Sequence, residues 1–351
     1  MGELKFEPIW EPLFLKDGNP YTESLFNHTM KPPFRNLHLF EKPYDVTDAN
    51  LILKWSTGVV GATGMGKSNF IKVVATGLLR AKPIYAPMFF LDHTGELRGL
   101  YEYFKRDIIE ITHLVESIEQ VVVNPISGRT KKIYHTYGAR DAEAFVAGFK
   151  SYYLDRSEFL GQRTSVLAYL HDFLTETSNI KRRQMREGKK NRPHLFIFDE
   201  IHNYDPEGSL STVGCDDDTL PKLVRDDIVM YFGEMRKYGA PVLGASQRPA
   251  RWDKDTLSQT NNKVILPLIE DADIDQVRGK LPPHIKRNLP QLMTEMRLEK
   301  NRGKAFLSTV HGFAIPRILP CDRHIPDLGS TPGVAEALGW EEGETGEQIF
   351  S

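Results

Sequence analysis

The chain has 351 residues, with 45 Lys and Arg against 47 Asp and Glu, and a net charge of −2. This balance excludes a protein that holds nucleic acid through its overall charge, so any such contact requires a local patch. The two cysteines, Cys215 and Cys321, indicate neither a disulfide framework nor a metal-ligand cluster. No apolar run approaches the ~20 residues of a membrane span, and residues 1–10 lack signal-peptide character. We therefore expect a cytoplasmic protein without membrane contact.

Residues 1–50 are rich in proline and aromatic residues and have no clean periodicity. We interpret them as an irregular N-terminal arm or small subdomain that packs on a neighbour. The apolar run Leu51-Ile52-Leu53, together with Trp55, Val59 and Val60, predicts a strand that leads into a glycine-rich turn. Residues 69–80 then show the apolar spacing of a helix.

The turn between this strand and helix reads Gly-Ala-Thr-Gly-Met-Gly-Lys-Ser at residues 61–68, a complete G-x-x-x-x-G-K-[ST] phosphate-binding loop. Its glycines let successive backbone N–H groups point at phosphate oxygens, and the following helix turns its positive end toward them. Lys67 would reach the β- and γ-phosphates and the Ser68 hydroxyl would ligate Mg²⁺. The sequence therefore predicts binding of ATP with Mg²⁺ by Gly61, Ala62, Thr63, Gly64, Met65, Gly66, Lys67, Ser68 and Asn69.

Beyond the loop helix, strands and helices alternate. Residues 84–92 and 107–112 are expected to be strands, the first of which ends in the segment Asp92-His93-Thr94-Gly95-Glu96. Two amphipathic helices follow, the second over residues 162–177. For the first, Asp141 is the expected cap, and its apolar face would carry Phe145, Phe149, Tyr152 and Tyr153.

A basic stretch at residues 181–192 holds seven cations against one acid, Glu187. The cations are Lys181, Arg182, Arg183, Arg186, Lys189, Lys190 and Arg192. Such density fits contacts with nucleic-acid phosphates, but it also fits a solvated, mobile linker, and the sequence leaves both open.

The apolar run Leu195–Phe198 ends in Asp199 and Glu200, the form of a Walker B strand. We expect Asp199 to hold Mg²⁺ and Glu200 to polarise the water that attacks the γ-phosphate. Gln247 follows the next strand, Val242–Ser246, where its side chain can contact the γ-phosphate or that water. The second acid and the glutamine favour hydrolysis over binding alone.

The rest of the chain completes the alternating pattern. An acidic loop at residues 205–218 precedes a helix ending near Met235, and a short helix at 253–259 precedes a strand at 264–268. Residues 271–300 are mostly helical in pattern, residues 305–319 form a hairpin, and residues 321–351 a flexible tail. The alternation predicts an α/β fold whose mainly parallel sheet is covered by helices on both faces.

Taken together, these segments resemble the HerA/FtsK superfamily of DNA-pumping ATPases, and HerA more closely than FtsK. The resemblance rests on the loop at 61–68, a D-x-x-G-E segment at 92–96, Asp-Glu-Ile-His at 199–202 and a later block. That block comprises Arg236-Lys237-Tyr238-Gly239 and Ser246-Gln247-Arg248-Pro249. The resemblance as a whole covers roughly residues 52–320, so an ATPase domain is expected over residues 51–320.

The resemblance implies a RecA-like P-loop NTPase fold, and a hexameric ring around double-stranded DNA with nucleotides between neighbouring subunits. Arg236 would then be the arginine that reaches the next subunit's γ-phosphate, although a cation near a helix C-terminus also has an electrostatic reason to be there. Arg248 and Arg251 are the rival fingers. The segment between Glu200 and Arg236 is longer than the family pattern, which predicts an insertion at 203–222.

Cellular HerA proteins carry a β-barrel where this sequence has its aromatic arm, and the FtsK membrane spans and winged helix are not evident. This favours a compact motor of a virus, plasmid or other mobile element, with a nuclease or mobile-element protein as partner. Two alternatives remain. One is a conjugation or secretion coupling ATPase that acts on protein or nucleoprotein cargo, and the other is a nucleotide-switched assembly partner of a nuclease.

Overall fold

A computed structural model describes residues 49–80, 86–124, 126–189, 191–207, 219–281 and 283–298. It also describes residues 301, 303–309, 312–314, 318, 321 and 324–325. The predicted N-terminal arm, the C-terminal tail and most of the predicted insertion at 203–222 lie outside these residues, so those predictions stay open.

The described residues form one nine-stranded sheet in which seven consecutive strands run parallel. In spatial order the seven are β9 (Asn262–Ile265), β1 (Thr57–Val60), β8 (Val242–Ser246), β7 (Leu195–Phe198), β2 (Met88–Asp92), β6 (Ser151–Asp155) and β3 (Ile108–Glu110). Next to β9, β10 (Phe306–Thr309) pairs antiparallel, and β11 (Gly312–Ala314) pairs antiparallel with β10. The α/β class with a mainly parallel sheet is confirmed.

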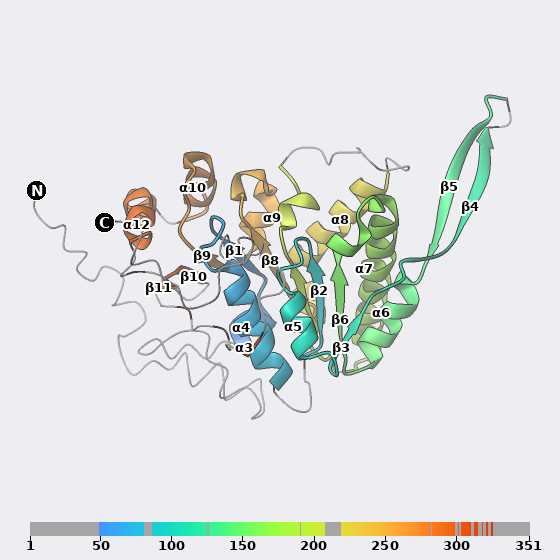
Figure 1. Cartoon of the computed structure of the whole chain (residues 1–351), viewed down its shortest axis with the longest axis horizontal. Coiled ribbons are helices and arrows are strands. Elements are labelled where there is room, and N and C mark those ends of the chain that lie inside the picture. The colour runs from blue at the N-terminus through green and yellow to red at the C-terminus, as the bar shows by residue number, and fades with distance from the viewer. Residues whose placement is uncertain are drawn as a thin grey trace, which may run out of the picture.

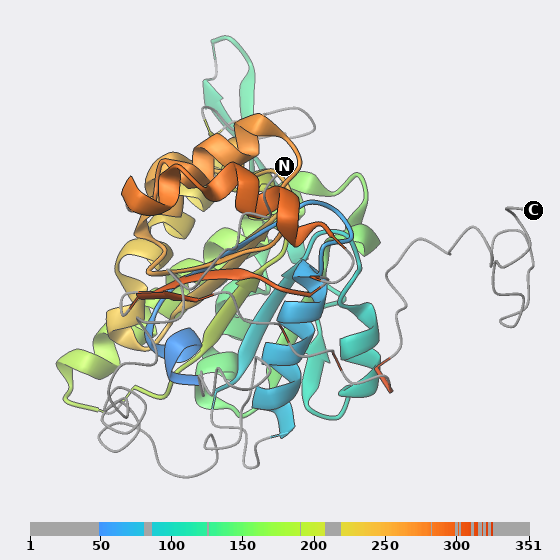
Figure 2. The same ribbon diagram turned by 90° about the vertical axis from the view of Figure 1, so that its left-hand side faces the viewer.

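Helices cover both faces of this sheet, which is why its central strands are apolar throughout and not alternating. One face packs against α3 (Ala49–Lys54), α4 (Lys67–Arg80) and α5 (Arg98–Tyr103). The other packs against α6 (Gly138–Ala147), α7 (Arg163–Arg186), α8 (Leu220–Gly233), α9 (Lys254–Gln259), α10 (Asp271–Arg278), α11 (Pro283–Lys286) and α12 (Leu289–Met296). Figure 2 shows the sheet between the blue α4 and the yellow and orange helices.

The sheet order separates the strand of the phosphate loop from the strand of the acidic pair. β8 lies between β1 and β7, with Val60 opposite Ser246 and Phe198 opposite Gly244. Because the three strands are parallel, their carboxyl ends meet at one edge of the sheet, which is where ligands bind in open α/β sheets. The loop at 61–68, the acids at 199–200 and Gln247 all follow these ends.

The first predicted strand begins later than the sequence pattern suggested. Leu51, Ile52 and Leu53 belong to the helix α3, and β1 begins only at Thr57. A run of three apolar residues fits either element, and here Ile52 and Leu53 pack on the α4 side of the sheet.

The first amphipathic helix is shorter than predicted. α6 ends at Ala147, where the Gly148 N–H bonds the Ala144 carbonyl, and residues 151–155 form β6. Tyr152 and Tyr153 therefore point to opposite faces of the sheet instead of sharing a helix face. Asp141 is not the cap either, since its carboxylate accepts a hydrogen bond from the Tyr169 hydroxyl at 2.9 Å.

One described element was not predicted from the sequence at all. β4 (Val115–Asn124) and β5 (Arg129–Thr136) form an antiparallel hairpin that projects away from the domain in Figures 1 and 2. Ile118 and Val122 on β4 are each more than half exposed. The hairpin therefore exposes apolar side chains outside the main fold.

Candidate nucleotide-hydrolysis site

The phosphate loop lies between β1 and α4 in the conformation that its sequence requires. Gly64 and Gly66 have φ angles of +75° and +100°, which other residues adopt only at a cost. The Ala62 N–H bonds the Pro267 carbonyl at 2.9 Å. At Gly61 a Cβ atom would lie 2.6 Å from the Leu266 Cβ, so only glycine fits there. The loop is thus held against the segment that follows β9.

Lys67 lies at the start of α4, is only 5% exposed and donates a hydrogen bond to the Gly61 carbonyl at 3.0 Å. Burial lowers the pKa of this lysine, although Glu200, Asp199 and Glu96 act in the opposite direction. The ammonium group therefore lies within the field of three carboxylates at the same edge of the sheet.

The Ser68 hydroxyl donates a hydrogen bond to the Glu96 carboxylate. Glu96 was not among the predicted site residues, although it belongs to the D-x-x-G-E segment that the sequence displays. Asp92 explains its position. The buried Asp92 carboxylate accepts hydrogen bonds from the backbone N–H groups of Gly95 and Leu97, at 2.9 and 2.8 Å, and so folds the segment back toward α4.

Asp199 follows β7, is 4% exposed and accepts a hydrogen bond from the Thr94 hydroxyl at 3.1 Å. Burial raises the pKa of Asp199 well above its ordinary value, and the carboxylates of Glu200, Asp92 and Glu96 raise it further. A divalent cation would relieve this crowding of negative charge. Ser68 and Asp199 therefore fit as protein ligands of a Mg²⁺ ion, which binds nucleotide sites through few protein groups, several waters and the phosphates.

This donor set differs from a metal site built by protein alone. Within the described residues, no group of three or more His, Cys, Asp and Glu side chains could hold a metal ion. A nucleotide-dependent Mg²⁺ site needs no such group, because the phosphate oxygens supply the remaining ligands.

Glu200 has a left-handed backbone, with φ at +46°, the one non-glycine residue with positive φ in the part of the chain described. Such a conformation costs about 1–2 kcal/mol and is held only where neighbouring contacts enforce it. Here the Gln247 backbone N–H donates to Glu200 Oε2 at 3.0 Å, and His202 Nδ1 lies 3.2 Å from the same oxygen. Burial raises the pKa of Glu200, but these hydrogen bonds and Lys67 outweigh it and bring the pKa below its ordinary value. Glu200 is thus kept ionised.

Gln247 contacts the phosphate loop directly, since its side-chain oxygen accepts a hydrogen bond from the Thr63 hydroxyl at 2.7 Å. Ser246, one residue earlier, has its hydroxyl 3.0 Å from His202 Nδ1. The end of β8 therefore connects the loop to the segment after Glu200. His202 and Thr94, like Glu96, make contacts in this site that sequence reasoning did not assign.

Arg236 lies far from these groups, at the opposite edge of the sheet. It belongs to η4 (Met235–Tyr238), which precedes β8. Its guanidinium stacks over the Trp55 ring at 4.4 Å and donates to the Asn261 side chain at 2.7 Å. Both partners precede the parallel strands β1 and β9. The rival Arg248 lies at the site's own edge and pairs with Asp273 at 3.3 Å.

The basic stretch is not a mobile linker over its described part. Helix α7 continues to Arg186, nine residues beyond its predicted end at Thr177. Lys181 is fully buried and donates to the Arg192 carbonyl and to His194 Nδ1, at 2.5 and 2.7 Å. Arg192 stacks over Phe149 at 4.4 Å. Lys181 thus holds the C-terminal end of α7 to the segment before β7, whereas Arg183, Arg186 and Lys189 are exposed.

Comparison with known families supports the assignment of a nucleotide-hydrolysis site. Residues 46–203 match the family model described as the central domain of the helicase HerA. This span contains the phosphate loop, the D-x-x-G-E segment and the acidic pair. The resemblance to the HerA/FtsK superfamily is thereby confirmed, and these features are those of a HerA/FtsK-type P-loop ATPase. Arg236 and Gln247 lie outside the matched span.

Solved structures with a similar fold come from several systems. The genome packaging NTPase B204 of Sulfolobus turreted icosahedral virus 2, in complex with ATP-gammaS, is 14% identical over 76% of this chain and 98% of that chain, with a TM-score of 0.45. EssC ATPases 2 and 3 from Geobacillus thermodenitrificans are 11% identical over 77% of this chain and 40% of theirs, with a TM-score of 0.45. The pCW3 conjugation coupling protein TcpA is 15% identical over 78% and 62%, with a TM-score of 0.43.

No curated protein matches the chain significantly. Among the described residues, no helix combines the length and apolar character that a membrane crossing requires.

Proposed function

We propose that the chain is an ATP-driven translocase of double-stranded DNA that hydrolyses ATP at the interfaces of a ring, by a Mg²⁺-dependent mechanism. The supporting observation is the ionised Glu200, held by Gln247 and His202 at the edge of the sheet where the phosphate loop also lies. A protein that only binds nucleotide has no need of a strained, buried carboxylate in this place.

Each residue of the site has a part in this proposal. The loop N–H groups and Lys67 bind the phosphates, and Ser68 and Asp199 hold Mg²⁺, which neutralises charge on the β- and γ-phosphates when bound. Glu200 orients and polarises the attacking water. Gln247, whose side chain bonds Thr63 of the loop, senses the γ-phosphate and transmits its presence to Glu200 through its own backbone N–H.

Arg236 completes a site only in a neighbouring copy. The residue lies at the amino ends of the strands, and the chain's own phosphate loop lies at their carboxyl ends. A finger role for Arg236 therefore requires an assembly in which the amino-end edge of one subunit's sheet faces the carboxyl-end edge of the next subunit's sheet. A head-to-tail ring has this property.

A DNA substrate is supported by the HerA central domain that residues 46–203 match. The experiment is a measurement of ATP hydrolysis with increasing duplex DNA. We expect duplex DNA to raise turnover severalfold, with less stimulation by single-stranded DNA. Turnover that duplex DNA leaves unchanged would contradict the proposal.

The second candidate is a coupling ATPase for protein or nucleoprotein cargo, and the projecting β4–β5 hairpin favours it. Ile118, Val122 and Ile133 are 55%, 58% and 40% exposed, which suits contact with another protein. Such an ATPase would be stimulated by its protein cargo and not by naked duplex DNA.

A further inference from the structure

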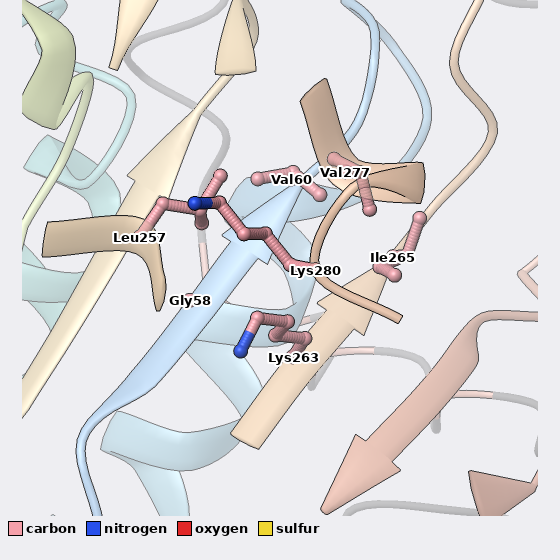
Figure 3. A pocket seen from close by; sticks show the side chains of 7 residues that line it. All are labelled: Gly58, Val60, Leu257, Lys263, Ile265, Val277 and Lys280. Carbon is pink, nitrogen blue, oxygen red and sulfur yellow. The ribbon is translucent and has the colours of Figure 1, made fainter. Parts of the chain in front are cut away.

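Two cavities outside the phosphate loop differ in what they can hold. The first lies between β1, β9 and the end of α10, and Lys263 and Lys280 line it together with apolar residues (Figure 3). The volume open to water molecules there is about 0 Å³. Lys263 is satisfied within the fold, since its ammonium group donates to the Thr260 carbonyl at 2.5 Å. This void takes no ligand.

The second cavity has a volume of about 230 Å³ and lies at the carboxyl edge of the sheet, beyond β2, β6 and β7. Each strand contributes from the segment that follows it: His93 after β2, Arg156 after β6, and Asn203 and Tyr204 after β7. Arg163, in the first turn of α7, completes the polar lining.

The size of the cavity limits its ligand. Sites for drug-sized molecules measure roughly 300–1,000 Å³. A cavity of about 230 Å³ is too small for a second nucleotide but accommodates a single tetrahedral anion with bound water. Two buried apolar side chains, Val166 and Leu167, form the wall on the α7 side.

The charge in the cavity is positive. Arg156 and Arg163 bring two guanidinium groups, whose planar arrays of donors match the oxygens of phosphate. Burial lowers the pKa of His93 to about 4, and the charges of Arg156, His202 and Arg163 contribute, against an opposing effect of Glu200. The field of both arginines therefore reaches His93 inside the cavity.

We propose that this cavity is a second phosphate-binding site, distinct from the phosphate loop, in which Arg156 and Arg163 hold one phosphate group. The phosphate is either inorganic phosphate or a phosphodiester of bound DNA, and only this choice of source rests on the proposed function. The neutral imidazole of His93 and the Asn203 amide supply further polar contacts.

An anion in this cavity would act on the hydrolysis site through short connections. The Asn203 side chain donates to the Glu200 carbonyl at 3.1 Å, and the Tyr204 hydroxyl lies 3.2 Å from His93 Nδ1. His93 adjoins Asp92, the residue that folds the Glu96 segment toward Ser68. Occupancy of the cavity is thus linked to the position of both Glu200 and Glu96.

The test is calorimetric titration of inorganic phosphate into the full chain saturated with a non-hydrolysable ATP analogue, so that the loop is already filled. We expect one phosphate site to remain, and its affinity to fall at least tenfold in Arg156→Gln/Arg163→Gln. Arg140→Gln/Arg297→Gln, which removes two exposed arginines that do not line the cavity, should leave the affinity unchanged. Loss of phosphate binding in the wild-type chain on filling the loop, or equal affinity in all three proteins, would overturn the proposal.

A conservative single substitution tests the same role if the double variant fails to fold. Arg163→Lys retains the charge but loses the planar fork, so phosphate affinity should fall by a smaller factor. An unchanged affinity in Arg163→Lys, in a folded protein, would count against the role of Arg163. Failure of the chain to bind the ATP analogue would refute the proposed function, and the phosphate affinities of the arginine variants would still test the cavity.

The source of the phosphate is read from DNA binding at varied salt. If a phosphodiester fills the cavity, Arg156→Gln/Arg163→Gln should flatten the slope of log affinity against log salt by about 0.9 per lost contact, and inorganic phosphate should compete with DNA. An unchanged slope with intact phosphate binding assigns the site to inorganic phosphate. Both results support a phosphate site and differ only in its source.

Discussion

The backbone N–H of Gln247 donates a hydrogen bond to Glu200 Oε2 at 3.0 Å. This bond connects the residue after β8 to Glu200, the second of the two acids that follow β7. The Gln247 side chain, in turn, bonds Thr63 of the phosphate loop at 2.7 Å. One residue thus contacts both the loop that would hold the phosphates and the carboxylate that would activate water. A γ-phosphate that displaced the Thr63 contact would act on Glu200 through a single residue.

Substitution of Glu200 separates binding from hydrolysis. Glu200→Gln should bind ATP with near-normal affinity and lose turnover by at least about 10²-fold, because an amide cannot accept the proton of water. Glu187→Gln, an exposed acid at the end of α7, is the matched control and should hydrolyse normally. Nucleotide binding and phosphate release would be measured on both. Wild-type turnover in Glu200→Gln would refute the assignment.

Substitution of Lys67 should act one step earlier. Lys67→Ala removes the mobile cation that the β- and γ-phosphates require, so we expect nucleotide binding itself to be lost. Fluorescent-nucleotide titration distinguishes this variant from Glu200→Gln. Equal nucleotide affinity in Lys67→Ala and the wild type would show that the loop does not bind triphosphate in the expected manner.

Arg236 is expected to act across a subunit interface. Arg236→Ala should bind nucleotide and lose about 10³-fold or more of its hydrolysis, the range for arginine fingers. The neighbouring exposed residue gives a control, Lys237→Ala, which should be active. Mixing Arg236→Ala with Glu200→Gln subunits should restore partial activity, since some interfaces then contain both intact residues. Full activity of Arg236→Ala alone would instead direct attention to Arg248 or Arg251.

The exposed part of the basic stretch can now be tested without disturbing the fold. Neutralising Arg183, Arg186 and Lys189 together should flatten the salt dependence of duplex binding by about 0.9 per lost phosphate contact. ATP hydrolysis without DNA should be unaffected, because these residues lie at the edge opposite the phosphate loop. An unchanged salt slope would assign them a purely solvating role.

Lys181 should make the stability of the fold depend on pH. Burial, and secondarily Arg192, lowers its pKa from 10.5 to about 7. Between these two values the unfolded chain binds more protons than the folded one, so stability should rise with pH. The limit for one group is about 1.4 kcal/mol per pH unit. Lys181→Met should weaken this rise between pH 7.5 and 9.5 in denaturant unfolding. Lys263, with a pKa of about 8, contributes the same sign in both proteins. Identical pH profiles would refute the effect.

The sequence predicted the α/β class and brought the phosphate loop, Asp199, Glu200 and Gln247 to one edge, because each follows an apolar strand and parallel strands end together. It did not predict β6, since Tyr152 and Tyr153 continue the apparent helical spacing of α6 and only their burial on opposite faces shows a strand. The roles of Glu96 and His202 were equally hidden. Glu96 depends on the fold of the Asp92 segment, and His202 on the left-handed turn at Glu200, neither of which is a periodic pattern.

The basic stretch shows a further limit of sequence reasoning. Charge density alone does not distinguish Lys181, which is buried beneath the end of α7, from Arg183, which is exposed two residues later. The difference arises from helical geometry, because residues two apart point in different directions around a helix.

The central claim is that hydrolysis drives movement along duplex DNA, and displacement of a third strand from a DNA triplex tests it most directly. The account predicts that the wild-type chain with ATP and Mg²⁺ displaces the third strand. Glu200→Gln, which still binds nucleotide, should displace none. Steady ATP hydrolysis by the wild type on the triplex substrate, with no strand displaced, would contradict the claim.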